Sequence, residues 1–318
     1  MSMRKLLMLI IFCICAGLKS YAQQEPIYGQ YMFNTLAINP AYAGSHDMIG
    51  ATMLYRNQWI GVPGAPKTTM AGIDIPDNVN GLGYGFQIVN DQIGVQNTTG
   101  LTGAVSYRTH LLNENDELST GIQFAFANYQ ANFASIALIQ NFDPSFTGIT
   151  INKWLPNAGV GMYYHNEKFF LGISAPVLLN SQVGLRKTDF QNSAASVFST
   201  PHYFLNTGYV MNIDEDFAMK PSLLLKAVSG APINWDLNTN IYYRDALSIG
   251  ASYRSNAALV AMFQIRLNEQ WQFGYAYEKT LSNIKYYSTN THEFMFRYEM
   301  KPIKSILHPR TAGHSIYF

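Results

Sequence analysis

Apolar residues recur at every second position through most of the chain. In residues 82–88, Leu, Tyr, Phe and Ile alternate with Gly and Gln, and residues 247–254 repeat the pattern with Leu, Ile, Ala and Tyr. A period of two places successive side chains on opposite faces of a β-strand. Segments of this kind predict strands at 49–59, 67–76, 81–90, 99–111, 118–129, 157–165, 168–175, 202–212, 217–228, 232–243, 246–255, 257–267, 271–280 and 290–299.

The connections between these predicted strands alternate in length. Every second one is short and rich in turn residues, at 76–80, 113–116, 166–167, 214–215, 244–245 and 268–270. Those between them include the long links 60–66, 91–98, 130–156, 176–201 and 281–289, with short exceptions at 229–231 and 255–256. Short periplasmic turns alternating with longer extracellular loops are typical of outer-membrane barrels, and a soluble β-sandwich gives no reason for them. We therefore predict an all-β fold, a transmembrane antiparallel β-barrel of about 14 strands.

Composition favours the membrane barrel over a soluble all-β protein. Charged residues make up 13% of the chain and apolar residues 48%, whereas an average soluble domain has about 25% charged residues. A lipid-facing wall penalises a cation at the bilayer midplane by about 2–4 kcal/mol, which explains the scarcity of charge.

Residues 1–22 have the pattern of a secretory signal peptide. Arg4 and Lys5 precede an apolar run at 6–18, and the small residues Ser20 and Ala22 flank Tyr21 before Gln23. The run is shorter than the roughly 20 residues of a spanning helix, although an uncleaved anchor is the alternative. Both cysteines, Cys13 and Cys15, fall in this segment, so the mature chain has no disulfide, thiolate metal site or cysteine nucleophile.

The mature chain carries almost no net charge. Removing three of the 21 basic residues with the signal peptide leaves 18 against 20 acidic ones, about −2. Without a basic surface, nucleic acid is not an expected partner.

Residues 23–48 lack the strand pattern and contain the turn-forming cluster Asn39, Pro40, Ala41 and Gly44. Such a segment before a barrel can fold into the lumen as a plug, and a periplasmic tail is the alternative. We expect the barrel at 49–299 and a basic periplasmic C-terminal tail at 300–318, which could contact a partner or peptidoglycan.

The first predicted hairpin contains Tyr55, Arg56, Gln58, Trp59 and Pro66. Strand phase points Arg56 and Gln58 into the lumen and directs Tyr55 and Trp59 towards lipid or its interface. Prolines at 63 and 66 stiffen the loop between the two strands.

Charged residues at the lumen-phase positions of the whole predicted barrel are balanced in sign. There are five cations and four anions at these positions: Arg56, Arg108, Arg254, Arg266 and Arg297, and Asp74, Asp236, Glu278 and Glu293. An ion-selective pore shows an excess of one sign, whereas a balanced set favours paired networks that close or stiffen the interior. Gating by these charges is the alternative.

No catalytic, cofactor-binding or metal-binding residues are predicted. The seven histidines have no metal-ligand spacing, and His292-Glu293 lacks a second histidine four positions on. Neither a Gly-x-Ser-x-Gly motif nor a phosphate-binding loop occurs. We expect a protein that is not an enzyme and has no cofactor.

Several motifs resemble the PorP/SprF outer-membrane proteins of the type IX secretion system, a Bacteroidetes family. They are Asn39-Pro40-Ala41, Tyr55-Arg56-Asn57-Gln58-Trp59, Gly64-Ala65-Pro66, Gly172-Ile173-Ser174 after Phe169-Phe170, Gly208-Tyr209, Lys220-Pro221-Ser222, Tyr253-Arg254, Tyr275-Ala276-Tyr277 and His292-Glu293. The resemblance covers nearly the whole mature chain but not links 130–156 and 176–201. The family is similar to the fourteen-stranded fatty-acid channels, whose N-terminal hatch also carries Asn-Pro-Ala.

The resemblance implies a place in the outer membrane and a role in secreting large surface proteins, or attaching them to the cell, with gliding motility in some relatives. Its implied partners are outer-membrane lipids, type IX secretion components, a secreted surface protein, and a periplasmic lipoprotein or peptidoglycan-binding protein. We expect links 130–156 and 176–201 to meet the cargo, because loops on a rigid scaffold commonly carry binding. The alternative function is a channel for hydrophobic small molecules of the fatty-acid-transporter type.

Overall fold

The computed structural model describes residues 28–46, 48–111, 116–132, 150–179, 181–183, 197–229, 231–288 and 290–300. The predicted signal peptide, and the predicted tail beyond Met300, lie outside these residues. No helix in the described ranges is long and apolar enough to cross a membrane.

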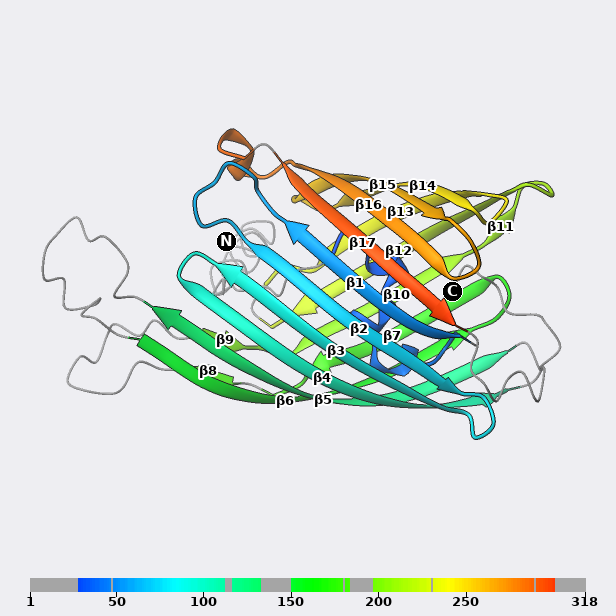
Figure 1. Cartoon of the computed structure of the whole chain (residues 1–318), viewed down its shortest axis with the longest axis horizontal. Coiled ribbons are helices and arrows are strands. Elements are labelled where there is room, and N and C mark those ends of the chain that lie inside the picture. The colour runs from blue at the N-terminus through cyan, green and yellow to red at the C-terminus, as the bar shows by residue number, and fades with distance from the viewer. Residues whose placement is uncertain are drawn as a thin grey trace, which may run out of the picture.

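One antiparallel sheet makes up most of the chain (Figure 1). Its strands are β1 (Ile49–Asn57), β2 (Lys67–Asp77), β3 (Leu82–Ile93), β4 (Gln96–His110), β5 (Glu117–Asn132), β6 (Thr150–His165), β7 (Phe169–Val177), β10 (His202–Tyr209), β11 (Met211–Asn212), β12 (Phe217–Val228), β13 (Asn234–Tyr243), β14 (Leu247–Arg254), β15 (Ala258–Arg266), β16 (Trp271–Thr280) and β17 (Thr291–Met300). Two further strands, β8 (Ser181–Val183) and β9 (Val197–Ser199), pair only with each other.

The sheet closes on itself through two pairings. β1 pairs with β17, the first barrel strand with the last, and β10 pairs with β12. Because β11 continues β10 along the same edge of β12, the closed ring contains 14 strands. The predicted fold class, an antiparallel barrel of about 14 strands, is confirmed.

Two predicted links are shorter than expected. β3 continues to Ile93 and β4 begins at Gln96. The long link predicted at 91–98 is therefore wrong, and a two-residue turn that contains Gly94, with a φ of 58°, replaces it. β5 and β6 likewise extend into the predicted link 130–156, and their pairing reaches Asn132 and Thr150. Polar residues in these extensions hid the strand pattern.

Side-chain–backbone hydrogen bonds close several of the short turns. Asn166, Asp214 and Asn268 each accept backbone N–H groups from residues two and three positions ahead, at 2.7–3.0 Å. Asp77 does the same at 3.2 and 3.4 Å. Asn and Asp form such turns readily, which explains why this end of the barrel has tight connections.

The two faces of the wall differ as the alternation predicts. Large apolar side chains point outwards, among them Met53 at 64% exposure and Phe124 at 61%. The inward positions carry mostly polar, charged or small residues, many of them fully buried, with large apolar exceptions such as Leu54, Leu224 and Met295. This is the distribution of a barrel whose outer surface is solvated by lipid.

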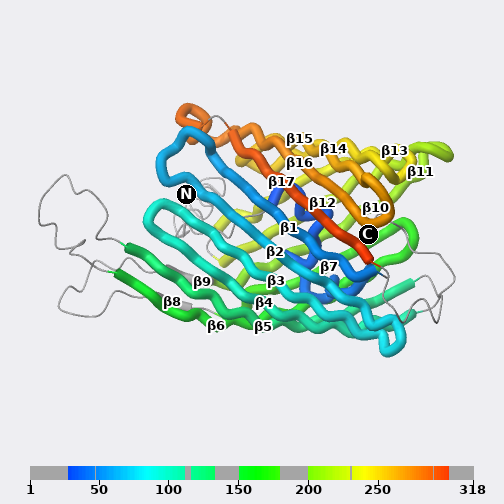
Figure 2. The backbone as a smooth tube through the Cα atoms, viewed as in Figure 1, coloured from blue at the N-terminus to red at the C-terminus, as the bar shows by residue number. Residues whose placement is uncertain are grey.

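Residues 28–46 lie inside the barrel, where Figure 2 shows the dark-blue segment surrounded by the wall. The segment forms three 3-10 turns, η1 (Tyr31–Phe33), η2 (Thr35–Ala37) and η3 (Pro40–Tyr42). Nearly all of its residues are buried. We call it the inner segment.

Candidate functional site

The turn at Asn39–Tyr42 is the most deeply seated part of the inner segment. Asn39 is fully buried, and its side-chain oxygen accepts the Ala41 N–H at 3.0 Å, which caps η3. Its Nδ2 donates to the Met162 carbonyl of β6 at 2.9 Å. The amide therefore shapes the turn and ties it to the wall at the same time.

Inward-facing glycines make room for this turn. A Cβ added at Gly83, Gly121 or Gly161 would collide respectively with Ala43 O, with the backbone of Pro40 and Ala41, or with Asn39 Oδ1. The inner segment thus lies directly on the wall. Its backbone contacts Gly83 of β3 and Gly121 of β5, and its Asn39 side chain and Pro40 ring contact Gly161 of β6. We call these three glycines the glycine bed.

Hydroxyl groups from neighbouring strands complete the seat. Ser106 Oγ donates to Ala43 O and Ser174 Oγ to Ile38 O, both at 2.6 Å, and both serines are buried. Each bond satisfies a carbonyl that the irregular backbone leaves without a ladder partner.

The opposite wall holds the start of the inner segment by charge. The Glu293 carboxylate of β17 accepts the backbone N–H groups of Gly29 and Gln30, both at 2.8 Å, and Arg56 Nη1 donates to it at 3.0 Å. Glu293 is 1% exposed. Charge-assisted hydrogen bonds in a buried site are the stronger kind.

Arg56 and Glu293 belong to a longer ionic chain. Arg56 Nη2 lies 2.8 Å from Glu278 Oε2, and Arg254 bridges Glu278 and Asp236, each at 3.2 Å. Asp236 also accepts a short hydrogen bond from Ser252. The chain alternates in sign, so each buried charge lies beside an opposite one.

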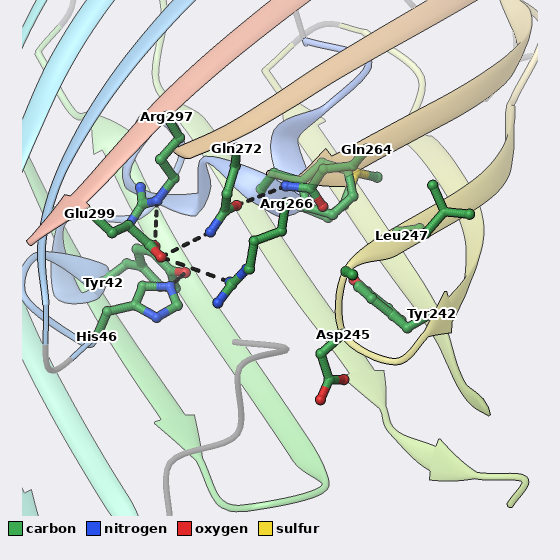
Figure 3. Close-up of a pocket in the computed structure, with 14 residues that line it drawn as sticks. Tyr42, His46, Tyr242, Asp245, Leu247, Gln264, Arg266, Gln272, Arg297 and Glu299 are labelled. Atoms are coloured by element: carbon green, nitrogen blue, oxygen red, sulfur yellow. Dashed lines mark hydrogen bonds and ion pairs between the residues drawn. The ribbon is translucent and has the colours of Figure 1, made fainter. Parts of the chain in front are cut away.

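A second network lies nearer the short-turn end. Arg297 contacts Asp74 at 3.4 Å and Glu299 at 2.8 Å, and Glu299 also accepts from Gln272 at 2.9 Å. Arg266 is more distant, 3.8 Å from Glu299 (Figure 3). Arg108, the remaining predicted lumen cation, contacts Glu117 and the Ser45 carbonyl.

The structure therefore brings together all nine lumen charges predicted from strand phase, each with a partner of opposite sign. It adds four buried charges that the prediction missed: Glu117, Glu299, Lys220 and Lys226. The lysines lie on β12, with their Nζ atoms 5.2 and 5.8 Å from the ring centroids of Phe170 and Phe204. Strand phase in β12 could have identified both.

The first hairpin lies at the opposite end from the short turns. Tyr55 points outwards while Arg56 points into the lumen, and Trp59 adopts a positive φ of 51°. The Gln58 N–H donates to Pro66 O, and the Trp59 N–H donates to Thr291 Oγ1. Hydrogen bonds to both neighbours hold this loop at the rim, beside the start of β17.

Little free space remains around the inner segment. One cavity at the short-turn end, lined by Tyr42, His46, Arg266 and others in Figure 3, has a volume of about 60 Å³. A second, beside Tyr31 and Lys220, has about 10 Å³. Burial raises the pKa of the Tyr31 and Tyr42 hydroxyls above their ordinary value.

The described residues contain no group of three His, Cys, Asp or Glu placed to hold a metal ion. The geometry that this site does provide is a seat for a peptide segment. The glycine bed lies on one side of it and an ionic wall around Glu293 and Arg56 on the other. Apolar wall residues, among them Phe204, Leu224 and Met262, also pack against the segment.

The model of one protein family, the type IX secretion system membrane protein PorP/SprF, matches residues 20–298. The chain belongs to the PorP/SprF family. This is a family of secretion-system membrane proteins and not of enzymes, and with the barrel fold it places the chain in the outer membrane. No curated protein sequence matches the chain significantly.

Solved structures similar to this PorP/SprF protein are also barrels. They include the Acinetobacter baumannii outer membrane protein Omp33, with 12% identity over 80% of this chain and 97% of that one and a TM-score of 0.42. A Pseudomonas aeruginosa FadL homologue has 13% identity, coverage of 89% and 96%, and a TM-score of 0.42. The CymD monoaromatic hydrocarbon channel has 10% identity over 89% of this chain and 94% of that one, with a TM-score of 0.45. These likenesses concern barrel shape alone.

Proposed function

We propose that this PorP/SprF protein is a closed docking barrel. It assists the secretion or surface attachment of large cell-surface proteins, of the adhesin or gliding-motility type, by binding cargo outside and periplasmic machinery inside. The observation that carries this proposal is the occupied lumen, in which the inner segment is bonded to both walls.

A conduit for polypeptide would have to expel the inner segment. That would break the bonds of Glu293 to Gly29 and Gln30 and those of Asn39 and Ser174 to the wall. Leaving such buried groups unpaired costs about 1–3 kcal/mol each. A protein that acts by binding at its two rims needs no such step, so the closed lumen supports docking.

The orientation follows from the connections. Short turns face the periplasm in outer-membrane barrels, and longer loops face the outside. The end with the β7–β10 connection is then external, and cargo would meet the loops predicted at 130–156 and 176–201. Residues 133–149, 180 and 184–196 of these loops lie outside the described residues. The short turns and the tail would meet a periplasmic lipoprotein or peptidoglycan-binding protein.

Affinity purification from native membranes tests this assignment. Replacing residues 178–200 by a short turn should remove a secreted surface protein from the purified material while periplasmic components remain. Replacing the turn at 268–270, on the opposite rim, should leave the cargo bound and serves as the control. Deletion of the gene should remove one surface protein from the cell. An unchanged surface composition in the deletion strain would refute the proposal.

The alternative, a channel for hydrophobic small molecules, predicts an apolar cavity beside the inner segment. The two lumen cavities among the described residues have volumes of about 60 and 10 Å³, whereas ligand pockets have roughly 300–1,000 Å³. Long-chain fatty-acid uptake by vesicles containing the protein would support the channel, and its absence would support docking.

A further inference from the structure

The barrel wall is taller on one side. The strands β4, β5 and β6 contain 15, 16 and 16 residues, whereas β14 and β15 contain 8 and 9. Figure 1 shows the extra length of β5 and β6 projecting at the end opposite the short turns. With the orientation argued above, this wall extends beyond the outer leaflet.

The outward side chains of this wall change character abruptly between neighbouring rows. Cross-strand partners form one apolar row: Ala71, Ile88, Leu101, Phe126 and Pro156. The next two outward rows are Thr69, Asn90, Thr99, Asn128 and Trp154, and then Lys67, Gln92, Asn97, Gln130 and Asn152. We call these ten residues the polar face. With strands about 4.8 Å apart, five strands make it about 19 Å wide.

Hydrogen bonds fix the amides of the polar face in place. Asn90 Nδ2 donates to Asn97 Oδ1 at 2.8 Å and to Thr99 Oγ1 at 2.9 Å. Asn128 Nδ2 donates to Asn152 Oδ1 at 2.8 Å, and Gln130 Nε2 donates to Asn128 Oδ1 at 2.7 Å. Side chains already ordered in this way lose little conformational entropy when they bind a ligand.

The polar face suits sugars better than a charged partner. Only Lys67 of its ten residues is charged. Asn128 is buried and holds Asn152 and Gln130, and the other amides and hydroxyls offer both donors and acceptors to the hydroxyl groups of a sugar. Trp154, at one end of the row, is 60% exposed, so its indole is open for stacking against the apolar face of a sugar ring.

The occupant is indicated by continuity with the lipid-facing belt. The first polar row lies two residues beyond the apolar row, about 7 Å along the strands, where the hydrocarbon of a membrane gives way to headgroups. The outer leaflet of an outer membrane consists of glycolipid, whose sugars begin at this level. We propose that the polar face binds the oligosaccharide of the outer-leaflet glycolipid.

The opposite wall has no comparable surface among its described strands. There the outward residues stay mostly apolar or aromatic close to the outer strand ends, as at Trp235, Tyr253 and Leu259, with Lys279, the β16 partner of Leu259, as a charged exception. Glycolipid would therefore be ordered on one side of the barrel only, beside the β5–β6 extension. Trp235 supplies a matched control, since it is also an outward tryptophan near the outer rim and is 37% exposed.

The test titrates the purified full chain in lipid nanodiscs with lipopolysaccharide from the native membrane, or with its lipid A part after removal of the sugars. Bound glycolipid is counted by native mass spectrometry. Wild type should bind intact lipopolysaccharide about tenfold more tightly than lipid A, and Trp154→Ala should remove most of this difference, as expected for the loss of one stacking contact and its buried area. Asn152→Leu should weaken binding in the same direction, and Trp235→Ala should not.

Equal binding of lipid A and intact lipopolysaccharide would overturn the proposal, as would equal losses in Trp154→Ala and Trp235→Ala. Loss of secreted-protein capture by Trp154→Ala with unchanged glycolipid binding would identify the face as a protein-docking surface and also overturn it. Folding of each variant is checked by its heat-modifiable migration on gels. The inference uses the proposed orientation but not the role in secretion, so intact glycolipid binding with normal secretion in a deletion strain would refute the proposed function alone.

Discussion

Glu293→Gln tests whether the ionic wall keeps the inner segment in place. The carboxylate of Glu293 accepts two backbone N–H groups at 2.8 Å and one from Arg56 at 3.0 Å. A glutamine amide has one acceptor oxygen, so at least one buried N–H group loses its partner. An unsatisfied buried donor costs about 1–3 kcal/mol, and breaking a buried ion pair about 3–5 kcal/mol.

Arg56 keeps Glu278 as a second partner, so we expect a cost near the lower end, about 3 kcal/mol. Because about 1.4 kcal/mol is a factor of ten, the population with a displaced segment should rise roughly a hundredfold. The assay is modification of Thr35→Cys, a buried position of the inner segment, by a membrane-impermeant maleimide. Both natural cysteines lie in the predicted signal peptide, so the introduced thiol is alone in the mature chain.

The matched control is Glu278→Gln, which alters the same ionic chain at a residue that pairs with Arg56 and Arg254. It should leave the labelling rate within a few-fold of wild type. If Thr35→Cys is labelled at the same rate in the Glu293→Gln and Glu278→Gln backgrounds, the Glu293 carboxylate does not hold the segment.

Three further predictions concern the seat and the wall. Gly161→Ala should lower the thermal unfolding midpoint, because its Cβ would collide with Asn39, whereas a Cβ at Gly103 meets no atom within 4 Å and Gly103→Ala should have little effect. Asn39→Ala should destabilise the folded barrel in urea titrations by about 1–3 kcal/mol, because it removes both the cap of η3 and the bond to the Met162 carbonyl, and a change near zero would show that neither bond matters. Phe124→Arg should lower the free energy of unfolding in the same titration by about 2–4 kcal/mol and Gln130→Arg by about 0–1 kcal/mol, because only Phe124 lies in the apolar belt. Equal losses would contradict the placement of the bilayer.

The fold could be predicted well because each strand of a barrel wall has a recognisable pattern in its own sequence. Outward residues must be apolar and inward residues small or polar, so the period of two identifies each strand without knowledge of its neighbours. The rule failed where the wall leaves the bilayer. At 91–93, 96–98 and 130–132 the outward residues are Gln and Asn, typical of a loop, so these residues are predicted as links although β3, β4 and β5 continue through them.

Less of the site could be predicted. Strand phase located the lumen charges, but their pairing depends on which strands face each other across the barrel, as with Arg297 and Asp74. The glycine bed is invisible in the sequence, because Gly161 differs from the outward Gly103 only in what lies against it. Lys220 has the inward phase of β12, but Leu223, Leu224 and Leu225 interrupt the alternation that marks lumen positions in this strand.

The pairing that closes the ring also has a consequence for assembly. In the β1–β17 register, Arg56 lies directly opposite Glu293, the residue that holds Gly29 and Gln30. The inner segment precedes β1 in the chain, so it is made before any wall exists to enclose it. Glu293, which joins the two terminal strands through Arg56, is thus also the residue whose carboxylate binds the backbone N–H groups of the inner segment. Biogenesis of this barrel therefore couples the timing of its final closure to capture of its own N-terminal residues.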